Sequence, residues 1–143
     1  MFKVDLVAIN PKDEERRTPP ISVTVDTGAE YSWLPAKILM EAGIFPRQKK
    51  YFSTATNQIV ERDTGFAIVT AEGFTTNEEV VFGIESDEPL LGVRTIEGFS
   101  VMVDNLNHKL IPTISRVTSF YRVDESNIDK IDKVNGTKWR EQT

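Results

Sequence analysis

The stretch ISVTVDTGAEYSWLP, residues 21–35, decides how the rest of the chain is interpreted. Apolar residues alternate with hydroxyl residues over positions 21–25, a pattern typical of a strand that is buried on one face. The strand runs directly into Asp26, and Gly28 two residues later provides a turn position without a Cβ atom. A second apolar run follows at Tyr31–Leu34. An acid held at the end of a strand, with turn amides folded around it, is a candidate catalytic carboxylate.

The composition is that of an ordinary globular domain. The chain has 143 residues, of which 39% are hydrophobic and 27% are charged, and this length fits one domain. A net charge of -5 and scattered basic residues argue against nucleic acid as a partner. The absence of cysteine excludes disulfides, a thiol nucleophile and thiolate metal sites. No segment has the apolarity of a signal peptide or membrane span, so we expect a soluble, cytoplasmic protein without a membrane partner.

The remaining pattern predicts an all-β domain with one or two short helices. Strands are expected at residues 2–9, 51–54, 59–62, 65–71 and 75–82, and in a final hairpin at 100–114. One helix is expected from Pro35 to a C-terminal cap at Gly43, and another at 93–99. We place the domain at residues 1–114. Residues 115–143 form a polar C-terminal tail, in which apolar residues at helical spacing are compatible with a short docked helix.

Two hairpins are expected in the middle of the chain. The first has mostly polar arms that meet around residues 55–58, so it should project from the body. The second turns at Glu72-Gly73 and carries the apolar residues of a core pair, including Phe66. Trp33 is most simply interpreted as a core aromatic.

Two short motifs stand out together: DTGA at residues 26–29, after an apolar strand, and LLG at residues 90–92, before a short helix. Their order, with a polar hairpin and a core hairpin between them, resembles that of the retropepsin-like aspartic proteases, the single-domain relatives of pepsin. The resemblance spans about residues 2–112 in element order and is specific at residues 25–29 and 90–92. It implies an acid protease barrel with one or two short helices.

The resemblance also implies a role for each matching residue. Asp26 would be the catalytic aspartate, and Leu91 and Gly92 would support its loop from behind. Glu30 is a candidate substrate contact, at a position where many members have Asp, Ser or Thr. The rest of the active-site loop would be Thr27, Gly28 and Ala29, and a flap at residues 54–60 would bind substrate through its tip, Ala55, Thr56, Asn57 and Gln58.

The chemistry of such enzymes implies a homodimer. Hydrolysis of a peptide bond by water, without a metal, requires one carboxylate to accept a proton while a second acid donates one. Two carboxyl groups about 3 Å apart cannot both ionise, and they share a proton. Because this chain has one DTG motif, Asp26 of two subunits would pair across a two-fold axis. The expected function is that of an aspartic endopeptidase acting on peptides or proteins, with no metal and no cofactor.

Other interpretations stay open. A non-catalytic dimer could keep the same fold for peptide binding or assembly, and the flap tip without glycine and Glu30 leave room for it. An unrelated small β-barrel binding module would need no dimer. For Asp26 itself the plainest alternative is a turn residue at a strand end, since Asp-Thr-Gly suits a turn by its own chemistry.

Overall fold

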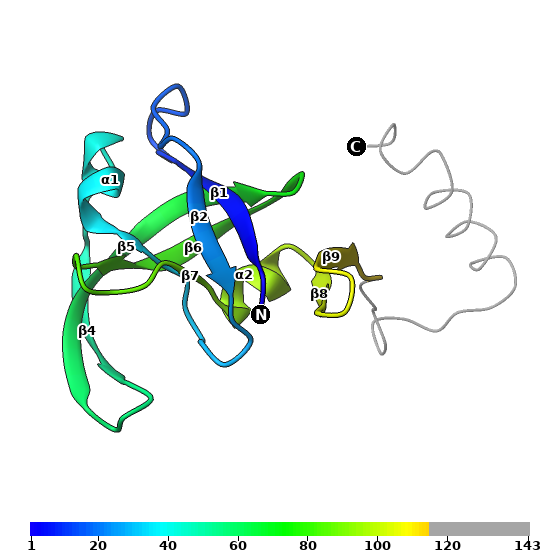
Figure 1. Cartoon of the computed structure of the whole chain (residues 1–143). Coiled ribbons are helices and arrows are strands. Elements are labelled where there is room, and N and C mark those ends of the chain that lie inside the picture. The colour runs from blue at the N-terminus through cyan, green and yellow to red at the C-terminus, as the bar shows by residue number, and fades with distance from the viewer. Residues whose placement is uncertain (115–143) are drawn as a thin grey trace, which may run out of the picture.

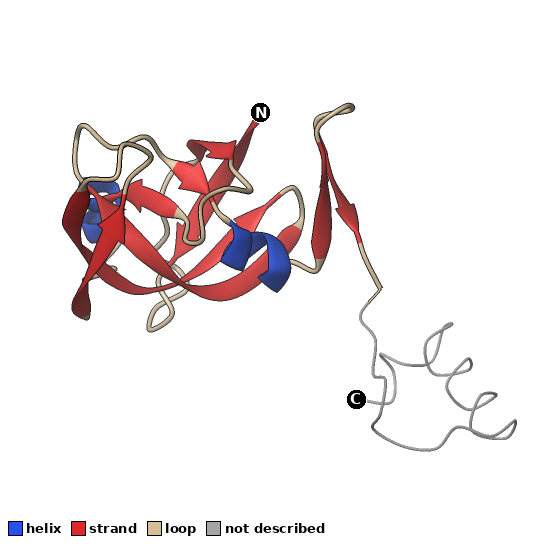
Figure 2. Cartoon of the chain, turned by 90° about the horizontal axis from the view of Figure 1, so that it is seen from below, coloured by secondary structure: helices blue, strands red, loops and turns tan. Residues whose placement is uncertain are grey.

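Strand pairing in the computed structural model produces a seven-stranded sheet that closes on itself (Figure 1). The order is β1-β2-β7-β3-β6-β5-β4, and β1 pairs a second time with β5. Six strands therefore form a closed ring, in the order β1-β2-β7-β3-β6-β5, and β4 pairs with β5 outside this ring. Figure 2 shows β8 and β9 beside this ring as a separate two-stranded sheet. The structure describes residues 1–114, so the helix considered for the tail lies outside the described residues.

The described part of the chain is one domain of mostly β-strands with two short helices, as the sequence predicts. The helices are α1 (Ala36–Glu41) and α2 (Val93–Gly98). The strands are β1 (Lys3–Ile9), β2 (Ile21–Val25), β3 (Trp33–Pro35), β4 (Gln48–Ser53), β5 (Ile59–Ala71), β6 (Phe74–Gly83), β7 (Leu90–Leu91), β8 (Val101–Asp104) and β9 (Lys109–Pro112).

β5 is one continuous strand of 13 residues, so the prediction of separate strands at 59–62 and 65–71 was wrong. The polar residue in the middle, Thr64, is fully buried, and its hydroxyl donates a 2.7 Å hydrogen bond to Glu79 on β6. A Cβ atom at Gly65 would lie 2.8 Å from the Phe45 carbonyl oxygen. A polar residue followed by glycine therefore marks a close packing point within the strand and not a break between two strands.

The long strand pairs with three strands along its length, and its residues 68–71 pair with β1. Its first half pairs with β4, from Gln48↔Thr64 to Ser53↔Ile59. Its second half pairs with β6 and ends at the turn Glu72-Gly73, where both residues have positive φ, 54° and 85°. This is the two-residue turn that joins tightly paired antiparallel strands, and it confirms the turn expected from the sequence.

The core lies inside the ring. Alternate residues of β1, β2 and β5 point inward and are buried, among them Leu6, Val23 and Val69. Phe66, expected in the core, lies on the opposite face of β5 and is 50% exposed. Side chains alternate between the two faces of a strand, and Ala67 and Val69 share the buried face. The expectation for Phe66 was wrong because it was based on the size of the side chain and not on this alternation.

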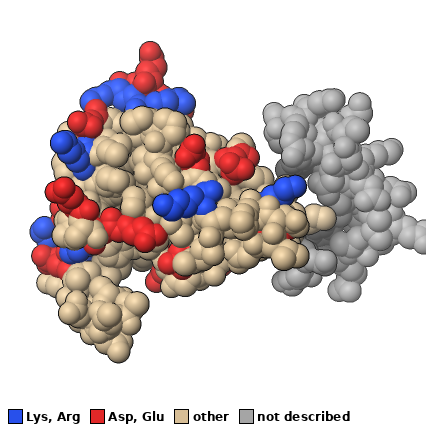
Figure 3. Space-filling view, viewed as in Figure 1, with Lys and Arg blue, Asp and Glu red and all other residues tan. Residues whose placement is uncertain are grey.

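The β4–β5 hairpin extends from the body, as expected from its sequence, and its end points toward the bottom of Figure 1. The loop that follows β2 points the same way. Residues 51–60 contain no charged side chain, and this end of the molecule is free of red and blue atoms in Figure 3.

Candidate active site

β7 lies between β2 and β3, although these two strands are consecutive in the chain. It pairs in parallel with β2, through Val25↔Leu91, and antiparallel with β3, through Trp33↔Leu90. The segment between β2 and β3, residues 26–32, is called here the Asp26 loop. Because β7 fills the space between its two flanking strands, the loop is held above the end of β7.

Asp26 is half-buried at the end of β2, and its loop folds back around it. Its backbone N–H donates to the carbonyl oxygen of Leu91 at 2.9 Å. The Gly28 N–H donates to the Oδ1 atom of Asp26 at 2.8 Å, and the Ala29 N–H donates to the Asp26 carbonyl oxygen at 3.2 Å. The carboxylate is thus oriented by the backbone of its own turn.

Residues 90–95, called here the support segment, lie directly beneath the Asp26 loop. The N–H groups of Val93 and Arg94 donate to the carbonyl oxygens of Ala29 and Glu30, at 2.8 and 2.9 Å. A Cβ atom at Gly92 would lie 2.3 Å from the Tyr31 carbonyl oxygen, closer than any real side chain approaches. Glycine is therefore the residue that allows the two backbones to come so close.

A buried pair of hydroxyl groups joins the loop to the support segment. The Oγ atom of Ser32 accepts a hydrogen bond from the Gly92 N–H at 3.0 Å and lies 2.6 Å from the Oγ1 atom of Thr95. Ser32 and Thr95 are 1% and 0% exposed. Water cannot replace these bonds, so the loop and α2 are fixed relative to each other.

A cleft of about 1030 Å³ opens in front of Asp26. Of the residues expected at the site, Asp26, Gly28, Ala29 and Glu30 line it from one side, and Ala55 and Gln58 line it from the hairpin side. The cleft lining does not include Thr27, Thr56, Asn57, Leu91 or Gly92. Leu91 and Gly92 lie in the support segment, and Thr27 lies in the Asp26 loop. Thr56 and Asn57 lie between β4 and β5, at the end of the hairpin.

Residues 54–58, called here the hairpin tip, close the β4–β5 hairpin by bonds within themselves. The Thr54 N–H donates to the Gln58 carbonyl oxygen at 2.8 Å, and the Asn57 N–H donates to the Thr54 carbonyl oxygen at 2.9 Å. Asn57 has a φ of 62°, in the left-handed region that asparagine tolerates better than most side chains. The turn therefore forms without glycine.

Three aromatic residues form one wall of the cleft: Tyr31, Trp33 and Phe52. The Phe52 ring meets the other two edge to face, with centroids 5.5 Å from Tyr31 and 5.2 Å from Trp33. Trp33 is half-buried and faces this cleft, so its expected place in the core was wrong. The wall provides an apolar surface for a bound side chain.

An ion pair lies at the edge of this wall and had no signal in the sequence, because its partners are 25 positions apart. The Arg62 guanidinium donates two hydrogen bonds to the Asp87 carboxylate, at 2.7 and 3.0 Å, and lies 5.9 Å from the centre of the Trp33 ring. The Arg62 hydrogen bonds lower the pKa of Asp87 below its ordinary value, against the opposing effect of burial.

A second polar cluster anchors the base of the β4–β5 hairpin. The Lys50 ammonium donates to the Tyr31 hydroxyl at 3.1 Å and to the Glu79 carboxylate at 3.0 Å. Thr64 and Gln48 also donate to that carboxylate, at 2.7 and 3.0 Å. Burial raises the pKa of Glu79, but the hydrogen bonds from Thr64, Lys50 and Gln48 together outweigh it and hold the pKa below its ordinary value.

Glu30 forms an ion pair with Arg94. Its Oε2 atom accepts two hydrogen bonds from the Arg94 guanidinium, at 3.2 and 3.0 Å, and the guanidinium carbon lies 4.3 Å from the centre of the Tyr31 ring. Both charged side chains are partly exposed at the cleft side of the loop. A substrate that contacts Glu30 would therefore meet a charge already balanced by Arg94.

No protein-family model matches this chain, and no curated protein sequence matches it. Within residues 1–114 no group of three or more His, Cys, Asp or Glu side chains is arranged to hold a metal ion. None of the helices in this part of the chain has the length and apolarity needed to cross a membrane.

Proposed function

We propose that the chain is an aspartic endopeptidase of the retropepsin-like class, active as a homodimer in the cytoplasm. The observation that carries the proposal is the position of Asp26 at a strand end, with its carboxylate oriented by the Gly28 amide and facing a cleft. The closed ring of strands and the insertion of β7 beneath the Asp26 loop support a retropepsin-like barrel. The glycine at position 92 supports it too, because the contact with Tyr31 leaves no space for a side chain.

In the proposed reaction two Asp26 carboxyl groups, one from each subunit, share a proton and hold a water molecule between them. The ionised carboxylate takes a proton from the water as the oxygen attacks the peptide carbon, and the other carboxyl group protonates the carbonyl oxygen. The carboxyl group that received the proton from water then gives it to the nitrogen, and the other carboxylate takes a proton from a hydroxyl group of the tetrahedral intermediate. The C–N bond breaks, which releases the amine and the new carboxylic acid. A subunit alone supplies half of this pair, so the monomer is expected to be inactive.

The hairpin tip is proposed to cover an extended peptide in the cleft. Ala55 and Gln58 line the side of the cleft that faces the bound chain. The aromatic wall of Tyr31, Trp33 and Phe52 would accept an apolar side chain next to the scissile bond. An extended peptide would also form main-chain hydrogen bonds with the cleft edge, which give affinity with little dependence on sequence.

The test is cleavage of a peptide library between about pH 3 and pH 8, a range that brackets carboxyl titration. Wild type and Asp26→Asn are compared, with the mass of each in solution measured in parallel. We expect a dimer that cleaves peptides and a loss of about 10³-fold or more in Asp26→Asn, since a general acid-base group is removed. Unchanged thermal unfolding of the variant would show that the loss is chemical. A monomer whose activity survives the substitution would rule out the dyad.

Two observations favour a second candidate, a non-catalytic dimer that binds peptides. Glu30 is neutralised by Arg94, and the hairpin tip contains no glycine, so both could serve a binding surface as well as an enzyme. A folded dimer that binds library peptides but cleaves none at any pH would favour this candidate.

A further inference from the structure

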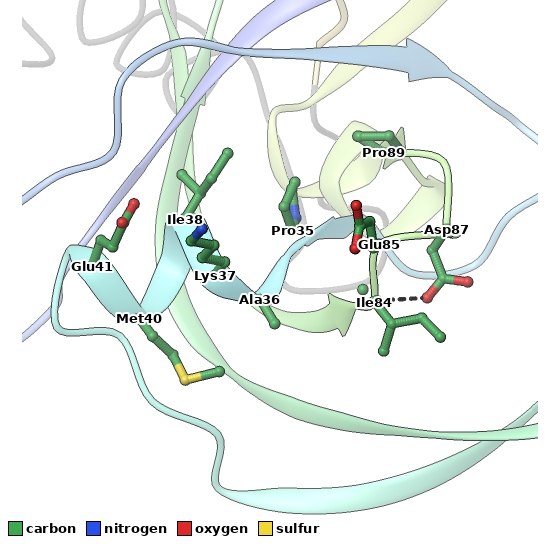
Figure 4. A pocket seen from close by; sticks show the side chains of 11 residues that line it. Pro35, Ala36, Lys37, Ile38, Met40, Glu41, Ile84, Glu85, Asp87 and Pro89 are labelled. Atoms are coloured by element: carbon green, nitrogen blue, oxygen red, sulfur yellow. Dashed lines mark hydrogen bonds between the residues drawn. The ribbon is translucent and has the colours of Figure 1, made fainter.

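A second hollow, lined mainly by apolar atoms, lies away from Asp26. This groove has a volume of about 1020 Å³ and runs between α1 on one side and the loop from Ile84 to Pro89 on the other (Figure 4). The side chains of Met40 and Ile84 border it from the two sides and are 39% and 51% exposed. Two large apolar side chains at the mouth of one groove form a surface that favours an apolar partner.

The groove and the Asp26 cleft share a wall. Asp87 lines both hollows, Pro89 lines the groove, and Glu88 and Leu90 line the cleft. The wall is held in place, because the Asp87 carboxylate accepts hydrogen bonds from Arg62 on the cleft side and from the Ile84 N–H on the groove side. The second of these bonds is the dashed line in Figure 4. One stretch of backbone therefore separates the two hollows.

The rim of the groove is acidic. Glu41 and Glu85 line it, and within residues 1–114 neither carboxylate forms an ion pair. Lys37 is the basic residue of the lining. In Figure 3 acidic side chains gather over the loop between β6 and β7. The excess of negative charge favours a ligand that carries Lys or Arg beside its apolar side chains.

We propose that this groove binds a flanking segment of the peptide whose scissile bond lies at Asp26, a segment that combines apolar and basic residues. The proposal rests on the proposed function, because it takes the cleft as the place where the peptide is cut. An extended peptide advances about 3.3 Å per residue, so six further residues reach about 20 Å beyond the cleft. The shared wall makes the groove the next apolar surface along that path. The groove would then select substrates by residues distant from the cut.

The first test compares matched peptides. A short substrate from the library screen is extended by six residues at either end, with Leu and Lys, with Leu and Glu, or with Ser alone. We expect the Leu-Lys extension at one end to raise kcat/KM about tenfold over the short peptide, a gain equivalent to burial of one or two apolar side chains. Ile84→Ser or Glu85→Lys should reduce this long-to-short ratio toward one.

Two matched substitutions outside the groove serve as controls. Phe45→Ser replaces an apolar side chain that is 61% exposed, and Glu72→Lys reverses an exposed acid in the β5–β6 turn. Both should keep the long-to-short ratio of the wild type. A ratio that is unaffected by the groove variants would overturn the proposal. So would a groove variant that alters the mass of the particle in solution with the ratio intact, since the groove would then be a contact between copies of the chain.

The second test does not depend on cleavage. The peptide acetyl-Lys-Leu-Lys-Leu-amide is titrated to about 5 mM into isotopically labelled Asp26→Asn protein, a range suited to weak binding. We expect amide chemical-shift changes at residues 36–41 and 84–87, and none at residue 45 or 72. Shifts at the groove without cleavage of any peptide would support the groove and refute the protease. Cleavage without such shifts would refute the groove and leave the protease standing.

Discussion

The Asp26 loop and the hairpin tip face each other across one cleft, yet they are held by different kinds of contact. The loop depends on distant residues: its backbone is bonded to Leu91, Val93 and Arg94, more than sixty positions away in the sequence. The hairpin tip depends on itself, through hydrogen bonds between Thr54 and Gln58. The position of Asp26 is therefore a property of the whole fold, whereas the opposite wall can change locally.

The largest expected effect of breaking the contacts that hold the Asp26 loop is at Gly92. We expect Gly92→Ala to lower the free energy of unfolding by about 3 kcal/mol and to abolish cleavage, because overpacking against backbone forces the loop away. Chemical denaturation of the variant measures the first effect. The Cβ atom would meet the Tyr31 carbonyl oxygen at 2.3 Å and the Ala29 carbonyl oxygen at 2.9 Å.

Gly73→Ala is the matched control for this substitution. Gly73 has a φ of +85° and no atom within 4 Å of an added Cβ, so the variant introduces backbone strain alone. It should cost about 1 kcal/mol and leave cleavage intact. Equal losses at the two glycines would mean that close packing beneath the Asp26 loop contributes little.

A hydroxyl group on each side of the cleft gives a second comparison. The Ser32 hydroxyl is buried and forms hydrogen bonds with the Gly92 N–H and the Thr95 hydroxyl. The Thr54 hydroxyl, at the hairpin tip, likewise forms hydrogen bonds with one backbone N–H, that of Gln58, and one hydroxyl, that of Thr56. We expect Ser32→Ala to cost about 2 kcal/mol, since the Gly92 N–H is left buried without an acceptor.

Thr54→Ala should change the unfolding free energy by less than about 0.5 kcal/mol, since the two lost hydrogen bonds are exposed and water replaces them. Equilibrium unfolding of both variants in urea makes the comparison. If the two costs were equal, burial would not be the feature that distinguishes the loop from the tip.

The sequence predicted the parts of this structure that depend on local chemistry. Alternation identified β2, and glycine after an acid identified both the Asp26 turn and the Glu72-Gly73 turn. The LLG motif was placed beneath the Asp26 loop through a resemblance, and in the structure Gly92 lies there. In each case the signal is local: an alternation of apolar and polar residues, or a glycine that leaves space where a Cβ atom would be.

Features that depend on long-range pairing could not be read from the sequence. The Arg62–Asp87 ion pair forms because β5 passes the loop before β7, and nothing near either residue indicates the other. Phe66 faces outward because pairing with β6 sets the register of β5, a choice that side-chain size does not reveal. The groove beside α1 likewise arises only when Met40 and Ile84 are brought together.

A smaller effect than at Gly92 or Ser32 is expected at the base of the hairpin, and it depends on pH. The Glu79 side chain is 10% exposed and accepts a hydrogen bond from Lys50. The substitution Glu79→Gln keeps the shape of this side chain and removes its negative charge. Because folding lowers the pKa of Glu79, its ionised form stabilises the native state above about pH 4.5, and this contribution is lost as the pH falls through the lowered value. We expect the variant to be less stable than wild type by about 1 kcal/mol at pH 7, and the difference to shrink toward pH 3.

Unfolding experiments at several pH values measure this difference, and hydrogen exchange locates it. Exchange should accelerate at the amides of β4 in Glu79→Gln and stay unchanged at Gly92, because the Glu79 carboxylate binds Gln48, Lys50 and Thr64 and no residue of the support segment. Glu72→Gln, which removes an exposed carboxylate from the turn, is the control. A stability difference that is constant with pH would show that Glu79 acts through packing. Faster exchange at Gly92 as well would show that loss of the Glu79 charge reaches the Asp26 loop through the hydrogen bond between Lys50 and Tyr31.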